Sequence, residues 1–333
     1  MLRLTNPPKP KRGKMKKIDT AYFPGFTRKS ITFTIDDGNI EYDTKLLNIL
    51  RPHGIFGTFN LHRCDRLTPE EYRALYSGYE IANHCKNHAL VIKEGMNIPI
   101  SDKPFDATHS DISYLYKIAD GVYNIHIYTY WGKNTGNYEP PRGWHAIAPL
   151  EDYKRFAVET KEELEKIFGE GMVKSFAWPH GNGSDEAKSF LIEEGYTNIR
   201  KTGDLRDRTG FDMPSDRFGW TYNAHDTTLL EVMELYESYP DDGKLKFFSF
   251  GVHSADFERN STWEALEEFA RKYGDRPNDY YYGTVADILD YEDALGSLVI
   301  SEREISNPSK RTLYLTVDGE RVTLNRGAHL SLI

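Results

Sequence analysis

The sequence has few cysteines and no long apolar run. Cys64 and Cys85 are the only thiols in 333 residues, so no disulfide framework holds the fold and nothing requires an oxidising compartment. No apolar stretch approaches the roughly 18 residues of a membrane span. The first 30 residues also lack the apolar segment of a secretory signal. These absences predict a cytoplasmic chain without a membrane span, although a chain whose leader had been removed would have the same sequence.

An excess of positive charge is also lacking. Lys and Arg number 42 against 51 Asp and Glu, which leaves a formal net charge of −9. This balance argues against nucleic acid as the main partner. The basic run within residues 1–22 is interspersed with prolines, and it is more typical of a solvated N-terminal tail than of a membrane-binding or polyanion-binding patch.

Strand-like apolar runs alternate with helical spacing along most of the chain. Residues 30–35 are rich in β-branched and aromatic side chains, residues 42–50 have helical spacing, and residues 55–61 are again strand-like. The same patterns predict further strands at 79–82, 173–178, 197–200, 218–222 and 246–252, and helices at 69–77, 150–168, 184–194 and 228–238. Repeated alternation of this kind predicts an α/β fold with a mostly parallel sheet, and the number of units indicates a barrel.

Two regions depart from this alternation. Between about residues 89 and 149 the pattern is lost and aromatic residues are dense, which predicts an insertion into a barrel that spans residues 23–291. The rings could stack on sugars or simply pack the insertion. They are Tyr114, Tyr116, Tyr123, Tyr128, Tyr130, Trp131, Tyr138 and Trp144. Residues 292–333 alternate around Asp318-Gly319, which predicts a hairpin within a small C-terminal β appendage.

Carboxylates and histidines follow the predicted strands, which is where active sites lie in a parallel α/β barrel. Asp36 and Asp37 repel one another unless a cation or a proton lies between them, although a solvent-facing Asp-Asp-Gly turn would have the same sequence. His84 and His88 are spaced i, i+4, so a helical turn would place both imidazoles within reach of one metal ion. Cys85 lies about 100° away around such a turn and is not expected to be a ligand.

Two further polar positions end predicted strands. Residues 177–181 read Ala-Trp-Pro-His-Gly, which is either an ordinary turn or a rigid one whose main-chain N–H near His180 faces a reacting carbonyl. His253 ends the last strong strand, and a lone histidine there is more often structural than catalytic. The carboxylate pair, the His-x-x-x-His pair, the Pro-x-Gly turn and the terminal histidine nevertheless occur in this order, each at a strand end.

In that order, and in two motifs, the sequence resembles the polysaccharide deacetylases of carbohydrate esterase family 4, the NodB-homology family, over roughly residues 23–291. Residues 33–38, FTIDDG, resemble the family's Thr-Phe-Asp-Asp-Gly motif with Ile35 in place of Phe. Residues 79–88, YEIANHCKNH, resemble its second motif, in which Gly-x-Glu-Ile leads to two histidines. The resemblance implies a distorted (β/α) barrel. It also implies a hydrolase that removes acetyl groups from an N-acetylated, or less often O-acetylated, glycan.

The resemblance further implies a mononuclear divalent cation, most often Zn2+, with Asp37, His84 and His88 as its ligands. It implies that Asp36 is the general base and that His253 protonates the leaving amine. The main-chain N–H near His180 would help to stabilise the oxyanion. Two imidazoles and one carboxylate leave open coordination positions for water and a substrate oxygen, which agrees with this division of roles.

The chain departs from the family pattern at two places. Where many members carry an Arg that tethers the base, this chain has Ala177, so the tether would come from elsewhere, with Arg200 and Arg217 as candidates. The family's fourth motif, whose Asp tunes the catalytic histidine, has no clear match, and Asp204 and Asp216 are both candidates.

Two other functions are compatible with the sequence. A related barrel hydrolase acting on a small cyclic amide or ureide is slightly favoured by the missing secretion signal, whereas the aromatic insertion favours sugars. A catalytically inactive carbohydrate-binding protein would bind metal and glycan without releasing acetate, but it would have little reason to keep the whole set together. The set is Asp36, Asp37, His84, His88 and His253. An O-acetyl esterase acting on xylan would need the same residues. The oligomeric state is not predicted.

Overall fold

The centre of the protein is a seven-stranded parallel sheet. The computed structural model describes residues 16–91, 100–101, 114–119, 122–126, 146–148, 150–181, 183–202 and 210–333. The strand order is β11-β10-β4-β3-β2-β12, and β13 pairs with the start of β2. These strands are β2 (Lys29–Asp36), β3 (Gly57–Leu61), β4 (Glu80–Asn83), β10 (Ser175–Ala177), β11 (Asn198–Arg200), β12 (Lys246–His253) and β13 (Tyr280–Tyr282).

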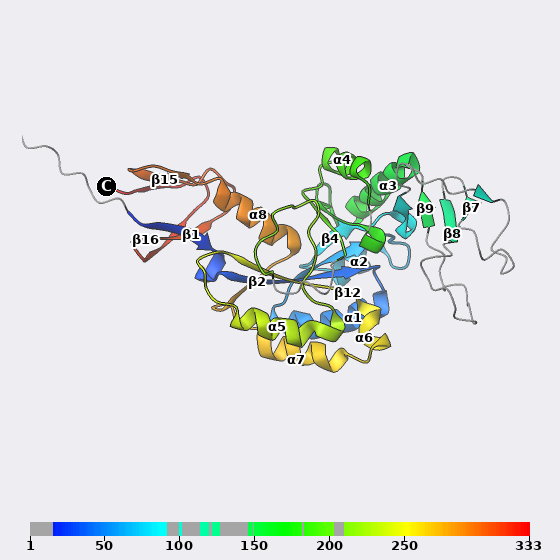
Figure 1. The fold of residues 1–333 in the computed structure, drawn as a ribbon, viewed down its shortest axis with the longest axis horizontal. Helices are drawn as coiled ribbons and strands as arrows, with labels where there is room; N and C mark the ends of the chain where they lie inside the picture. The colour runs from blue at the N-terminus through cyan, green and yellow to red at the C-terminus, as the bar shows by residue number, and fades with distance from the viewer. Residues whose placement is uncertain are drawn as a thin grey trace, which may run out of the picture.

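Helices cover the sheet, with α5, α6 and α7 below it in Figure 1 and α3, α4 and α8 above it. The helices are α1 (Ile40–Leu50), α2 (Pro69–Leu75), α3 (Leu150–Phe168), α4 (Asp185–Glu193), α5 (Leu229–Ser238), α6 (Ser254–Arg259), α7 (Trp263–Tyr273) and α8 (Val285–Gly296). Side-chain oxygens of Asn39, Thr68 and Ser184 accept backbone N–H groups at the starts of α1, α2 and α4, which explains why these helices begin close to the predicted positions.

The sheet curls into a half-barrel, so the predicted α/β fold and distorted (β/α) barrel are confirmed. The described residues between β11 and β12 pair with other strands through isolated bridges: parallel ones from Arg200 to Trp220 and from Ala224 to Phe250, and an antiparallel one from Asp212 to Lys246. The predicted strand at 218–222 is therefore wrong. Residues 218–222 hydrogen-bond to the chain just after β11, where the Trp220 carbonyl oxygen accepts from the Lys201 N–H. Three residues later the Asn223 N–H already donates to Ser249 of β12. The segment therefore runs beside neither strand for long enough to form a strand itself.

Strand β2 shows how the alternation of side chains places the polar groups. Ile31, Phe33 and Ile35 are fully buried in the main core, where Phe33 contacts Phe269 of α7 with ring centroids 5.6 Å apart. Each large apolar side chain buried in this way contributes about 1.5–3 kcal/mol. The period of two then directs Asp36 to the other face of β2, inside the barrel.

A small β module follows α8. One sheet joins β1 (Ile18–Tyr22), β16 (Leu313–Val317) and β17 (Glu320–Leu324), and the other joins β14 (Val299–Ile300), β15 (Glu304–Ser306) and β18 (His329–Ser331). The predicted hairpin at Asp318-Gly319 links β16 to β17, with φ of +51° and +87° at the two turn residues. Residues 18–22, which the sequence analysis assigns to the tail, instead form β1 and pair with β16.

A separate five-stranded sheet lies at the opposite end of the molecule from the β module (Figure 1). Its strands are β5 (Leu90–Val91), β6 (Ile100–Ser101), β7 (Tyr114–Ala119), β8 (Val122–His126) and β9 (Ala146–Ala148). The aromatic side chains that the sequence analysis considers as a sugar platform lie outside the described part of the structure. Among the described helices, none combines the length and the apolar character needed to cross a membrane.

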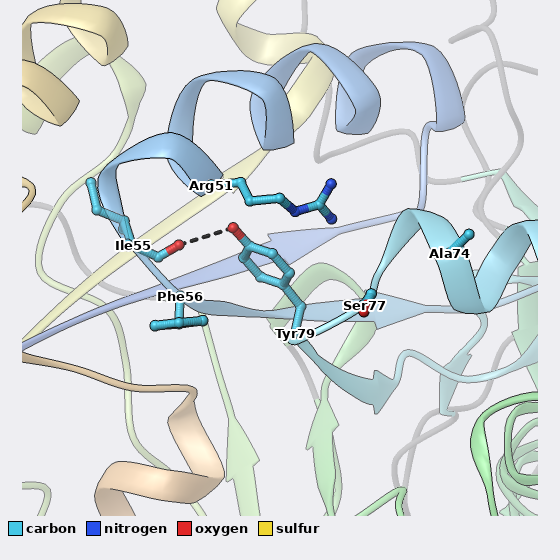
Figure 2. Close-up of a pocket in the computed structure, with 7 residues that line it drawn as sticks. Arg51, Ile55, Phe56, Ala74, Ser77 and Tyr79 are labelled. Carbon is cyan, nitrogen blue, oxygen red and sulfur yellow. Dashed lines mark hydrogen bonds between the residues drawn. The ribbon is translucent and has the colours of Figure 1, made fainter.

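One pocket lies at the amino ends of β3 and β4. Figure 2 shows Arg51 beside the ring of Tyr79, whose hydroxyl donates to the Ile55 carbonyl oxygen at 3.0 Å. The other lining residues are Gly54, Phe56, Ala74 and Ser77. None of the described residues that line this pocket is a histidine or a carboxylate, and active sites of parallel barrels form at the opposite ends of the strands.

Candidate active site

Histidines and carboxylates gather at the carboxyl ends of the barrel strands. A pocket there has about 410 Å³ of empty space, open solvent included. It is lined by Asp36, His84, His88, Trp178, His180, Thr202, Tyr222, His225, Val252 and His253. The strand ends that the sequence analysis singles out thus meet around one cavity.

Asp36 lies at the end of β2 and is held by Arg200. Arg200 Nη2 donates to Asp36 Oδ1 at 2.5 Å and to Oδ2 at 2.6 Å, and Asn60 Nδ2 donates to Oδ1 at 2.7 Å. Burial alone would raise the pKa of Asp36, but the adjacent Arg200 guanidinium and nearby imidazoles outweigh it and hold that pKa far below its usual range. Asp36 is therefore an ionised acceptor.

The structure distinguishes between Arg200 and Arg217, the two arginines considered as partners of Asp36. Arg217 points to α8, where it donates to Asp293 at 2.8 Å and to Glu292 at 3.0 Å. Of the two candidates, Arg200 is the one that contacts Asp36 directly.

Asp37 follows β2 with a φ of +77°, a value that most residues avoid. Its backbone N–H donates to the Asn60 carbonyl oxygen at 3.1 Å, which fixes the turn. Asp37 Oδ1 is buried and has no hydrogen-bond partner among the described residues. Burial, reinforced by the Asp36 carboxylate and opposed by His253, raises the pKa of Asp37. A cation at Oδ1 would give this oxygen a partner and would stabilise the ionised form of Asp37 against burial and the Asp36 charge.

His84 and His88 bring their Nε2 atoms to within 3.1 Å of each other. The predicted helical turn is wrong in detail, because Cys85 has a φ of +54° and the following residues Lys86–His88 form a single 3-10 turn. His84 is buried, and its Nδ1 donates to the Ala177 carbonyl oxygen at 2.8 Å. Burial also lowers the pKa of His84 well below its usual value, so the ring is neutral and Nε2 carries a lone pair.

The ligand atoms of Asp37, His84 and His88 fit one small cation. All three lie within 4.8 Å of one another. Asp37 Oδ1 is 3.7 Å from His84 Nε2 and 3.6 Å from His88 Nε2. Tetrahedral zinc with bonds of about 2.1 Å separates its ligand atoms by about 3.4 Å. The observed separations of 3.1, 3.6 and 3.7 Å bracket that value.

His253 faces this group from β12. Its Nε2 lies 3.7 Å from Asp37 Oδ2, and its Nδ1 lies 3.0 Å from Asp256 Oδ2. Asp256, on the first turn of α6, was not expected from the sequence, although its spacing of three residues from His253 is that of a helix N-terminal cap. The two aspartates considered from the sequence for this supporting role are not seen beside His253. Asp216 accepts the Phe218 N–H at the surface, and Asp204 lies outside the described residues.

His180 is in the predicted turn and has a φ of +54°. Its ring packs edge-on against His88, with centroids 4.3 Å apart. The neighbouring N–H of Gly181 donates to the Trp178 carbonyl oxygen at 2.9 Å, so that group is not available to an oxyanion. Sequence reasoning also missed His62, whose ring lies 5.8 Å from that of His88.

The family described as polysaccharide deacetylase matches residues 24–199, more than half of the 333-residue chain. The chain belongs to this family. Membership confirms the resemblance found in the two motifs and the expected class of enzyme, a deacetylase. No curated protein matches the chain.

Several solved structures are similar. A putative polysaccharide deacetylase from Mycobacterium smegmatis matches with a TM-score of 0.50 and 14% identity, over 85% of this chain and 96% of the other, which bears on the fold alone. A family 4 acetyl xylan esterase from Clostridium thermocellum has a TM-score of 0.41 and 14% identity, over 79% of this chain and 91% of that one. A peptidoglycan deacetylase from Bacillus subtilis has a TM-score of 0.43 and 15% identity, over 80% and 92%.

Proposed function

We propose that this deacetylase removes acetyl groups from an N-acetylated glycan and holds one divalent cation, most readily Zn2+, at Asp37, His84 and His88. The observation that carries this proposal is the approach of three ligand atoms to separations of 3.1–3.7 Å, one of them a buried carboxylate oxygen with no hydrogen-bond partner among the residues that the structure describes. A cation bound there would polarise a carbonyl oxygen and lower the pKa of a bound water to about 7.

Asp36 is the proposed general base. Its carboxylate lies 4.0 Å from His84 Nε2, beside the proposed cation site, and it is kept ionised by Arg200. An ionised carboxylate within reach of a water molecule can take the proton that the water loses as it attacks the acetyl carbonyl. Arg200 also prevents the carboxylate from rotating away, because it contacts both carboxylate oxygens.

His253 is the proposed general acid. Asp256 accepts from Nδ1, which leaves Nε2 directed at the proposed cation site. An amine is a poor leaving group unless it is protonated, whereas an alcohol leaves more easily. A supported imidazole at this position supplies the proton that an N-acetyl substrate requires, since its amine cannot leave unprotonated.

Substitution of single residues tests the division of roles. Asp37→Asn should lose both bound metal and acetate release, because it removes a charged ligand while keeping the shape of the side chain. Asp36→Asn should keep the metal and lose most turnover. Metal content by mass spectrometry and acetate release from N-acetylglucosamine oligomers measure the two effects. The control is His329→Gln, because His329 is exposed and lies in the C-terminal module.

Three outcomes would contradict the proposal. Full activity of Asp36→Asn would remove the assigned base. Glycan binding without acetate release from any acetylated substrate would favour the carbohydrate-binding alternative. Turnover of a ureide such as allantoin, without acetate release, would favour a cyclic amide hydrolase.

A further inference from the structure

A second histidine shares the carboxylate that supports His253. His253 Nδ1 lies 3.0 Å from Asp256 Oδ2, and His225 Nε2 lies 3.4 Å from the same oxygen. The parallel bridge between Ala224 and Phe250 brings His225 beside the end of β12, and its ring lines the candidate active-site pocket. Two imidazoles from separate segments of the chain therefore converge on one acceptor.

His225 is itself held from its other ring nitrogen. Asp226 Oδ1 lies against His225 Nδ1, and the Asp226 side chain is fully buried. The second oxygen, Oδ2, accepts from Asn260 Nδ2 and Thr262 Oγ1, both at 2.8 Å. Since these two donors fix the Asp226 carboxylate, its Oδ1 restricts how far the His225 ring can turn. Both ring nitrogens of His225 therefore face a carboxylate oxygen, and the ring can donate to both only when both nitrogens carry a proton.

The other contacts of Asp256 constrain its Oδ2 less. Arg259 contacts Oδ1 rather than Oδ2, and its side chain is 67% exposed whereas that of Asp256 is 5% exposed, so water competes for the guanidinium and not for the carboxylate. The backbone N–H of His253 donates to Oδ2 at 3.2 Å, which positions the helix end rather than the His253 ring. Apart from His253 itself, His225 is the side chain that contacts Asp256 Oδ2 in the described part of the chain, and it is partly buried.

We propose that His225 is a positioning residue for the general acid. Through Asp256 Oδ2 it holds the carboxylate in line with His253 Nδ1, and so sets the direction in which His253 Nε2 faces the pocket. That His253 acts as a general acid rests on the proposed function. The contacts that link Asp226, His225, Asp256 and His253 do not depend on it.

Substitutions at His225 separate its two ring nitrogens. His225→Gln keeps a donor near the position of Nε2, towards Asp256, and His225→Phe keeps a ring of similar size without any donor. His225→Phe should lower kcat roughly tenfold, with KM and metal content unchanged, as is typical when the outer partner of a functional group is lost. His225→Gln should recover most of this loss. His53→Phe is the matched control, because His53 pairs with Asp275 at the amino ends of the strands, outside the site.

A second measurement does not depend on activity. In protein labelled with 15N-histidine, the Nδ1–H of His253 should exchange slowly with solvent in the wild type and in His225→Gln, and faster in His225→Phe. The signal is assigned by its loss in His253→Gln. Equal exchange in all the His225 variants would overturn the proposal, and so would a raised KM with unchanged kcat. If the wild type releases no acetate, the proposed function fails while the exchange measurement still decides the role of His225.

Discussion

Replacing Arg200 with methionine should destabilise the protein by about 3–5 kcal/mol, the usual cost of removing one partner from a buried ion pair. Arg200 donates to both oxygens of Asp36, at 2.5 and 2.6 Å, and the two side chains are only 2% and 11% exposed. Without Arg200, the buried carboxylate keeps only the bond from Asn60 among these close donors. At roughly 2 °C per kcal/mol for a chain of this size, the melting temperature should fall by about 6–10 °C.

The dependence of this loss on pH follows from the pKa of Asp36. In the wild type that pKa is depressed, so the ion pair contributes stability above the ordinary value of 3.8 and loses it only as the pH falls towards the folded value. In Arg200→Met, burial would instead raise the pKa of Asp36, and the carboxylate would be protonated in acid. The difference in melting temperature between the two proteins should therefore be largest near neutral pH and smallest below about pH 4.

Two variants make the experiment decisive. Arg217→Met removes an arginine whose partners Glu292 and Asp293 are 33% and 67% exposed, and it should cost no more than about 1 kcal/mol. Combining Arg200→Met with Asp36→Asn removes the stranded charge and should recover much of the lost stability. The reasoning is refuted if the two arginine variants melt alike, or if the double variant is no more stable than Arg200→Met alone.

Three other perturbations should have distinct outcomes. Gly181→Ala should lower both melting temperature and acetate release, because φ is +68° there and an added Cβ would overlap Thr202. Burial raises the pKa of Asp43 to about 7, so stability should fall as the pH rises from about 4 to 7; Asp43→Asn should lack that slope in melts at several pH values. A chelator should lower the melting temperature, and added Zn2+ at one hundred times its Kd should restore about 2.7 kcal/mol, as calorimetry would show.

Much of the barrel could be predicted from the sequence because its elements have strong local patterns. The predicted helix at 150–168 has the same bounds as α3, and the predicted strand at 246–252 is β12 without its last residue. The predicted strand at 218–222 failed because strand formation depends on neighbours that run alongside, and here each neighbour is met at a single bridge. Residues 18–22 pair with β16, almost 300 residues away, which no local pattern reports.

The candidate site, too, could be predicted from the sequence only in part. Strand-end positions together with the resemblance to two family motifs singled out Asp36, Asp37, His84 and His88, and parallel strands bring their carboxyl ends together. The conformation between the histidines was not predictable, since a φ of +54° at Cys85 replaces the expected helical turn. That turn brings the two Nε2 atoms together in a way that i, i+4 spacing alone does not describe.

By itself, the sequence determined which face of β2 carries Asp36, since the side chains of a strand alternate between its two faces. Only the tertiary structure decided which arginine holds Asp36 and which carboxylate supports His253. Arg200 is 164 positions from Asp36 along the chain, and it was chosen over Arg217 by the curl of the sheet, which brings β11 close to the end of β2. Distance in space sets the strength of an electrostatic contact, and separation along the sequence carries no information about that distance.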